Sequence, residues 1–237
     1  MTGSRPAFYA HPGSRLGDLV TLLHLPYTMW HLSYIVIGAA MAPRIDALRL
    51  VGTLLAFVFG LGIGAHALDE LHDRPLSTRL SPVTLWMLGW GGLGAGGALA
   101  IAASFVISPV ALAWGAGGVL LAAAYALEWS RWVHSMAGFG VAWGAFPVLV
   151  GYWAQTESLS LAVAVVAAAA TALSMSQRAL STPARHVRRK VRSATAKIGE
   201  ASWDRTTLLA TWERPLRLLA LAHVLLAIGL LLTHLPT

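Results

Sequence analysis

Two acidic residues with a spacing suited to metal chemistry stand at the end of an apolar run. Asp69 and Asp73 lie four residues apart in the stretch His66 to Pro75 (HALDELHDRP), and the upstream run Leu50 to Ala67 carries no charge. That run is long enough to cross a bilayer, and residues at i and i+4 of a helix share one face. Two carboxylates there repel each other unless a cation lies between them. Because Mg²⁺ takes a few carboxylates and leaves its other positions to water and phosphates, the spacing predicts a magnesium and diphosphate site at the mouth of an intramembrane cavity.

A simpler interpretation is that Asp69 and Asp73 only end the helix and meet water among the lipid headgroups. Acidic residues at a helix C-terminus oppose the helix macrodipole, so capping alone gives little reason for their presence. Lys or Arg is expected instead at the cytoplasmic end of a span. Acids close to the membrane interior usually have a function, and the metal-site interpretation is therefore preferred.

The composition indicates a helical membrane protein. The chain has 237 residues, of which 57% are apolar and 11% are charged, and its mean hydropathy is positive. These values are typical of proteins with several membrane spans. There is no cysteine, which excludes disulfides and thiolate metal sites. The net charge of +7 comes from basic residues between apolar runs, a pattern that predicts contact with membrane lipid and no nucleic-acid partner.

Apolar runs and turn signals predict an all-α, polytopic helix bundle in the cell membrane. About seven runs are long enough to span a bilayer, and the whole chain, residues 1–237, is expected to form a single transmembrane domain. The predicted spans are Leu19–Ala40, Leu50–Leu68, Val83–Ile107, Pro109–Leu127, Met136–Ala154, Leu159–Met175 and Leu216–Leu235.

The segment 178–212, before the last span, is predicted to be a basic cytoplasmic loop or a surface helix. Within it, the stretch from Pro183 to Ala196 favours a helix on the membrane surface, because its basic side chains would face anionic headgroups. A solvated tether is the alternative interpretation of the same charges.

The basic residues also predict the orientation of the chain. Of the 17 Lys and Arg residues, all except Arg44 and Arg49 fall on one side of the predicted spans. Under the positive-inside rule this side is cytoplasmic, and so is the N-terminus. The acidic pair then shares the cytoplasmic face with other candidate site residues. These are Arg74, Arg79, Glu128, Arg131 and Arg178.

The four arginines just named are candidates for binding a diphosphate, because a guanidinium offers planar, bidentate donors. For any one of them, the alternative is that it anchors the chain at the membrane surface. Glu128, at the end of the predicted fourth span, is a candidate metal ligand or else an ion-pair partner of Arg131 or Arg178. His66, three residues before Asp69, would orient that carboxylate or bond a substrate oxygen. A packed, neutral histidine bonded to a backbone carbonyl is the alternative.

With these motifs the chain resembles the UbiA superfamily of intramembrane prenyltransferases, over about residues 16–177. The family's Asp-x-x-x-Asp motif and its later Arg-Pro-Leu to Leu-Ser segment are similar to the stretch Asp69 to Ser81. Weaker likenesses are His24-Leu-Pro26 at the first span, Tyr125 to Arg131 after the fourth, and Trp143 to Pro147 in the fifth.

The chain departs from this family in two respects. The family's second acidic motif corresponds here to Ser174–Ser181, which contains no acid, and the family usually has about nine helices where this chain offers about seven. Glu128 is the candidate substitute for the absent acidic motif.

The resemblance implies an Mg²⁺-dependent enzyme that ionises an isoprenoid diphosphate and transfers the prenyl group to an acceptor. A terpene cyclase needs the same ionisation site and is one alternative, and a non-catalytic membrane protein that binds a polyprenyl phosphate is another. Catalytic and metal-binding roles are implied for Asp69, Asp73 and Glu128, and substrate-binding roles for His24, His66, Arg74, Arg79, Tyr125, Arg131 and Arg178.

Overall fold

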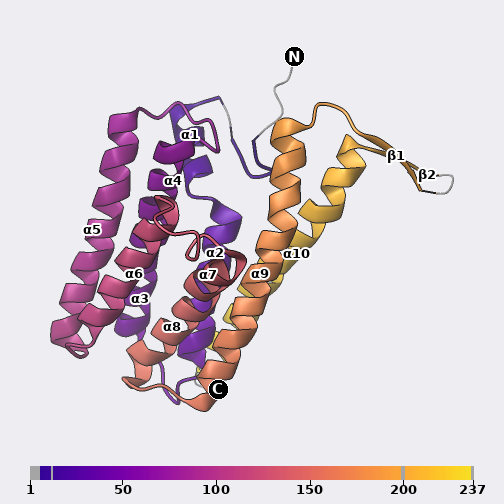
Figure 1. Cartoon of the computed structure of the whole chain (residues 1–237). Helices are drawn as coiled ribbons and strands as arrows, with labels where there is room; N and C mark the ends of the chain where they lie inside the picture. The colour runs from indigo at the N-terminus through magenta and orange to yellow at the C-terminus, as the bar shows by residue number, and fades with distance from the viewer. Residues whose placement is uncertain (1–5, 12, 199–200, 236–237) are drawn as a thin grey trace.

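The structure is a computed structural model that describes residues 6–11, 13–198 and 201–235. Long helices run side by side in a bundle, and one short hairpin projects beyond it (Figure 1). The predicted all-α bundle is confirmed.

The first half contains α1 (Arg15–Leu22), α2 (Leu25–Ala40), α3 (Ala47–Phe57), the π-helix η1 (Val58–Ala65), α4 (His66–Asp73) and α5 (Pro82–Val106). The second half contains α6 (Ala111–Ala126), α7 (Met136–Gly140), the π-helix η2 (Val141–Ala145), α8 (Phe146–Thr156), α9 (Leu161–Lys190), β1 (Thr195–Ile198), β2 (Ala201–Asp204) and α10 (Arg205–Leu232).

Polar residues fix where several helices begin. The side chains of Ser14, Asp46, Ser81 and Ser160 each accept a hydrogen bond from an amide in the first turn of α1, α3, α5 and α9, respectively. Such side chains satisfy amides that have no partner within the helix. The local sequence therefore sets these boundaries.

Five helical stretches among the described residues are long and apolar enough to cross a membrane, judged by length and composition. Each contains most of one predicted span. The stretches are Ala47–Asp73, Pro82–Val106, Met136–Thr156, Leu161–Lys190 and Arg205–Leu232.

The other two predicted spans fall on shorter helices. Helices α2 and α6 are 16 residues long, whereas a perpendicular crossing takes about 20. The predicted span Leu19–Ala40 is also interrupted, because His24 adopts a left-handed conformation with φ of 46° between α1 and α2. Five candidate spans, rather than about seven, are therefore established by length and composition.

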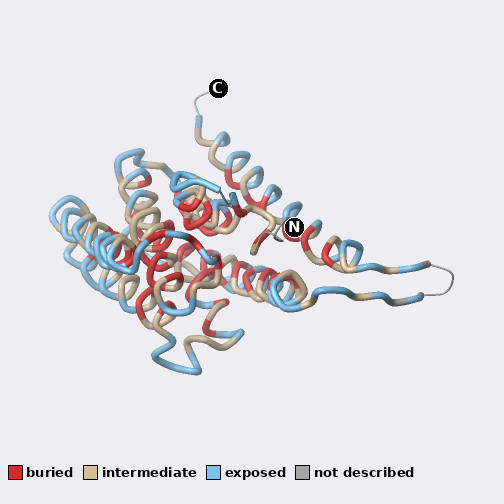
Figure 2. Tube along the Cα trace, turned by 90° about the horizontal axis from the view of Figure 1, so that it is seen from above, coloured by how far each residue is buried: buried red, intermediate tan, exposed pale blue. Residues whose placement is uncertain are grey.

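Helix α2 packs against both α8 and α10, so it lies inside the bundle. A Cβ atom at Gly38 would collide with the carbonyl oxygen of Val148, and one at Gly151 with that of Ile35. Glycine at both positions therefore allows the backbones of α2 and α8 to approach closely. Figure 2 shows buried residues gathered between the helices and exposed residues on the outer faces, as a bundle surrounded by lipid requires.

The helix that carries the acidic pair contains a π-helical segment. Helices α3, η1 and α4 follow one another without a break from Ala47 to Asp73, and η1 occupies the eight residues before His66. A π-helical segment winds more loosely than an α-helix and is frequent at functional sites. Because of this looser winding, His66 and Asp69 lie on different faces from those that they would have on an uninterrupted α-helix from Leu50.

Most described residues of the segment 178–212 belong to regular elements, and none of these elements is a separate surface helix. Helix α9 continues through Pro183 to Lys190, the strands β1 and β2 form an antiparallel hairpin, and residues 205–212 belong to α10 (Figure 1). Packing against α10 sustains the helix despite the proline. Arg188 donates from Nε and a terminal nitrogen to the two carboxylate oxygens of Glu213, both at 2.7 Å, and neither side chain is fully exposed.

Candidate functional site

The acidic pair lies at the end of α4. Asp69 is half-buried and Asp73, one turn later, is exposed. Within the described residues, neither carboxylate takes part in a hydrogen bond or an ion pair with another side chain. Both therefore keep their oxygen atoms available for a cation, and Mg²⁺ accepts one or two protein carboxylates together with substrate phosphates.

The neighbouring acid, Glu70, has a different role. Its side chain is fully buried and accepts hydrogen bonds from the amides of Leu76 and Thr78, each at 2.8 Å, and from the Thr78 hydroxyl at 2.9 Å. From its place next to Asp69 in the sequence, Glu70 would be expected to face the lipid headgroups or a cation, but its buried carboxylate does neither. This carboxylate holds the loop that follows α4, and the loop in turn fixes the end of the helix at Asp73.

Two histidines approach each other at the start of α4, the helix that carries the acidic pair. The rings of His24 and His66 lie 4.1 Å apart between centroids, and His66 Nδ1 is 3.2 Å from the carbonyl oxygen of Gly62. Nε2 of His24 is buried and has no hydrogen-bond partner in the structure. A buried polar atom without a partner is costly, so this atom is available to a ligand or a water molecule.

The N-terminal segment, residues 6–11, contacts His24 through Tyr9. The ring of Tyr9 lies 5.3 Å from that of His24 and 5.6 Å from that of Tyr27. Desolvation raises the pKa of Tyr9 above its usual range, and Tyr27 adds to this rise, while Arg185 and Arg189 act in the opposite direction. The phenol therefore stays protonated at neutral pH and can donate a hydrogen bond.

Two arginines of α9 act on Asp69 through their charge and not through a direct contact. Arg185 and Arg189 lie one helical turn apart, both are exposed, and neither forms an ion pair with Asp69 among the described residues. The positive charges of both nevertheless act on the Asp69 carboxylate, as do the negative charges of Glu70 and Glu128. Arg189 also donates from Nε to the carbonyl of Pro6 at 3.4 Å. We use the name Asp69 site for this group of residues. It consists of Tyr9, His24, His66, Asp69, Arg185 and Arg189.

Three of the predicted diphosphate-binding arginines lie outside this group. Arg74 turns back onto its own loop and donates to the carbonyl of Leu80 at 2.8 Å. The side chain of Arg79 is 65% exposed, and its amide bonds Asp18 at 3.1 Å. Arg131 is exposed and forms no hydrogen bond or ion pair with any described residue. A substrate-binding role for each of these three arginines stays a prediction.

The fourth arginine, Arg178, is held by protein groups. It donates to the carbonyls of His134 at 2.7 Å and Ser135 at 3.1 Å, and to the Tyr125 hydroxyl at 3.2 Å. Its guanidinium also lies over the ring of Phe139, 5.3 Å from the centroid. Arg178 and Tyr125 thus contact each other, and the contacts of Arg178 fix the loop between α6 and α7. A substrate-binding role for either residue stays a prediction.

The predicted third acid, Glu128, lies on that same loop. It is exposed, and its carboxylate lies 3.6 Å from Nε2 of His134, which makes an ion pair only when that histidine is protonated; it pairs with neither Arg131 nor Arg178. Among the described residues, no three His, Asp or Glu side chains gather closely enough to hold a metal ion. The structure therefore brings Asp69 and Asp73 to one face without Glu128, and the role of Glu128 as a metal ligand stays a prediction.

The Glu128→Gln variant separates these roles. We expect the free energy of unfolding without metal to fall by at most about 1 kcal/mol, because exposed ion pairs contribute little. Any dependence of ligand binding on Mg²⁺ should stay within about twofold of the wild type. Titrating Mg²⁺ against thermal unfolding of both proteins measures this, and loss of the dependence in the variant would restore Glu128 as a ligand.

The amino-acid pattern does not indicate that the tyrosine and the two arginines belong to the Asp69 site. The segment that carries Tyr9 has no apolar periodicity that would predict its position. Arg185 and Arg189 were expected to face lipid headgroups, because their run of basic residues is typical of a membrane surface. Their i, i+4 spacing does place both on one helical face, but nothing in the spacing identifies Asp69 as the group they approach.

An apolar cavity of about 270 Å³ lies in the other half of the bundle. Its lining on the helix Ala47–Asp73 runs from Leu48 to Leu61 and stops before His66. The expectation that Asp69 and Asp73 stand at the mouth of an intramembrane cavity does not hold for this cavity.

The fold and site define a class: an all-α protein whose apolar helices suit a membrane, with an acidic pair and two arginines at one end of the bundle. Comparison of the chain with models of known protein families, with curated proteins and with solved structures found no match.

Proposed function

We propose that the protein is a membrane enzyme of UbiA type that binds an isoprenoid diphosphate with Mg²⁺ and transfers its prenyl group to an acceptor. The observation that carries the proposal is the Asp69 site. There, a carboxylate without a partner among the described side chains lies at the end of a helix long enough to span the membrane, within electrostatic reach of Arg185 and Arg189.

The residues present fit a magnesium ion. Asp69 and Asp73 offer carboxylate oxygens on one helical face, and their oxygens are not used by other described groups. Bound there, Mg²⁺ would neutralise charge on the diphosphate as it leaves.

The protein's own groups have distinct roles in this proposal. Arg185 and Arg189 bind diphosphate oxygens with charge-assisted hydrogen bonds. The protonated Tyr9 donates a further hydrogen bond, and the buried Nε2 of His24 accepts or donates one according to its tautomer. Because residues 6–11 contact His24 through Tyr9, they limit the access of water to the reacting carbon.

The proposed topology has about seven spans, with the N-terminus and the Asp69 site on the cytoplasmic side of the cell membrane. Helices α2 and α6 would then cross a locally thinned bilayer with their 16 residues, with their polar flanking side chains near the interface. Arg44 and Arg49 lie at the opposite end from the remaining basic residues, which supports this orientation.

Removal of the two arginines tests the proposed substrate. The double variant Arg185→Gln/Arg189→Gln should bind farnesyl diphosphate with Mg²⁺ at least about tenfold more weakly, because each hydrogen bond between charged groups contributes roughly 1.5–3 kcal/mol. Calorimetry measures the binding, and release of inorganic diphosphate from farnesyl diphosphate measures the reaction.

The matched control is the double variant Lys190→Gln/Arg192→Gln, which removes the same charge at the end of α9 and just beyond it. Both residues are exposed and form no hydrogen bond or ion pair with the described residues. Binding in the control should stay within about twofold of the wild type. Equal loss in both double variants would show a general effect of surface charge and would contradict a site at Asp69.

A second candidate is a non-catalytic membrane protein that binds a polyprenyl phosphate. It is favoured by the absence of a group of three metal-binding side chains among the described residues, and by Gln177 and Arg178 in the stretch where the resemblance places acids. Binding without release of diphosphate would select this candidate. Formation of a cyclic hydrocarbon without an acceptor would instead select a terpene cyclase.

A further inference from the structure

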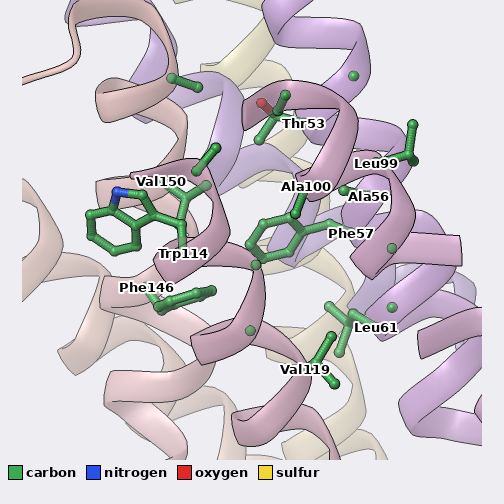
Figure 3. A pocket seen from close by; sticks show the side chains of 18 of the residues that line it. Thr53, Ala56, Phe57, Leu61, Leu99, Ala100, Trp114, Val119, Phe146 and Val150 are labelled. Atoms are coloured by element: carbon green, nitrogen blue, oxygen red, sulfur yellow. The ribbon is translucent and has the colours of Figure 1, made fainter. Parts of the chain in front are cut away.

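The apolar cavity forms a second place where a ligand can bind. It lies between α3, η1, α5, α6, η2 and α8, and Figure 3 shows that its labelled side chains are almost entirely carbon. Water has few polar partners in such a space, so the cavity is expected to be dry or filled by hydrocarbon. Its larger lining residues include Phe57, Leu61, Leu99, Trp114, Val119 and Phe146.

The cavity is separated from the Asp69 site by packed side chains. Leu61, Leu93 and Trp143 line its inner end and belong to one buried cluster with Leu68. Leu61 lies in η1, eight residues before Asp69 on the same continuous helix. A ligand whose charged end is bound at Asp69 therefore meets this cluster before it reaches the cavity.

Glycines create much of the space. A Cβ atom added at Gly52 or Gly60 would meet no other atom within 4 Å, and both residues line the cavity. The cavity therefore exists because side chains are absent from this wall. Larger residues can be introduced there without a collision with the backbone.

A charged group stands at the end of the cavity that is remote from Asp69. The side chain of Arg49 lines the cavity and is 22% exposed. One terminal nitrogen donates to Glu157 at 2.9 Å and to the carbonyl of Ala154 at 3.3 Å. The other nitrogens of the guanidinium have no partner among the described residues, so they can donate to an anion such as a phosphate.

We infer that this cavity binds one acyl chain of an anionic phospholipid, whose phosphate pairs with Arg49 in the leaflet opposite the Asp69 site. Lipid tails are as apolar as the cavity wall, so transfer from the bilayer gives little selectivity by itself. The paired phosphate supplies the selectivity, and the close fit of the chain between the helices adds dispersion contacts. This site is additional to the proposed function and does not depend on it.

Filling the cavity tests the acyl-chain site. Delipidated protein is offered equal amounts of phosphatidylglycerol and phosphatidylcholine in detergent, and retained lipid is counted by native mass spectrometry. The wild type should retain one phosphatidylglycerol molecule in preference to phosphatidylcholine. Gly52→Leu and Gly60→Leu should each reduce this retention at least about fivefold.

Matched controls are Gly91→Leu and Gly94→Leu on the exposed face of α5, where an added Cβ also meets no atom within 4 Å. These variants should retain phosphatidylglycerol as the wild type does. All four changes replace a glycine within a helix by a better helix former, so folding should be preserved. Thermal unfolding without lipid checks this for each variant.

Two further variants test the headgroup contact. Arg49→Gln should remove the preference for phosphatidylglycerol, whereas Glu157→Gln breaks the same ion pair but keeps the guanidinium and should preserve it. Full retention by folded Gly52→Leu and Gly60→Leu proteins, or equal retention of both lipids by the wild type, would overturn the inference. It would also be overturned if Gly60→Leu kept phosphatidylglycerol but lost farnesyl diphosphate, since the cavity would then belong to that substrate.

Discussion

Asp69→Asn and Asp73→Asn should each abolish the stabilisation that Mg²⁺ and farnesyl diphosphate together give the protein. A ligand that binds only the folded state contributes about 2.7 kcal/mol to the free energy of unfolding when its concentration is a hundred times its Kd. An amide is a weaker ligand for Mg²⁺ than a carboxylate and cannot neutralise the ion. Unfolding followed by tryptophan fluorescence, with and without the two ligands, measures the difference.

Neither substitution should greatly change stability when the ligands are absent. The two carboxylates accept no hydrogen bond from other described groups, so the effect should be within about 0.5 kcal/mol. His72→Gln, on the exposed side of the same helix, is the control and should keep the full stabilisation. If both aspartate variants also keep it, the magnesium site is wrong, whatever the result for the acyl-chain cavity.

Unlike the two aspartate variants, Glu70→Ala should lower the free energy of unfolding without ligand, by about 3–5 kcal/mol. The change leaves the amides of Leu76 and Thr78 buried without an acceptor, at roughly 1–3 kcal/mol each, and the Thr78 hydroxyl also loses its partner. The free energy of unfolding without ligand, measured by denaturant titration in mixed micelles, checks this expectation.

Glu70→Gln gives a graded comparison at the same position. Its amide oxygen can still accept from one of the two amides, but its NH₂ group faces a second donor, so the loss should be smaller than in Glu70→Ala. A stability equal to the wild type in Glu70→Ala would show that the loop from Arg74 to Leu80 does not depend on this carboxylate. The roles given to the adjacent acids Asp69 and Glu70 would then both have to be reassigned.

The sequence determined the helices well. Uncharged runs and the polar residues between them predicted the all-α bundle, and five of the predicted spans lie on helices able to cross a membrane. The spacing of Asp69 and Asp73 also placed both carboxylates at the end of one helix. These features are local, because a helix is defined by the periodicity and caps of a contiguous segment.

Only the tertiary structure decided which groups each site residue approaches. Arg185 and Arg189 reach the charge of Asp69 because α9 continues past Pro183 and packs against α10, whereas the basic run alone favoured a surface helix. Glu70 turned out to be buried because the loop after α4 folds back onto it. Such partners come from segments distant in the chain or from irregular loops, where no periodic pattern encodes the contact, so packing between helices had to select them.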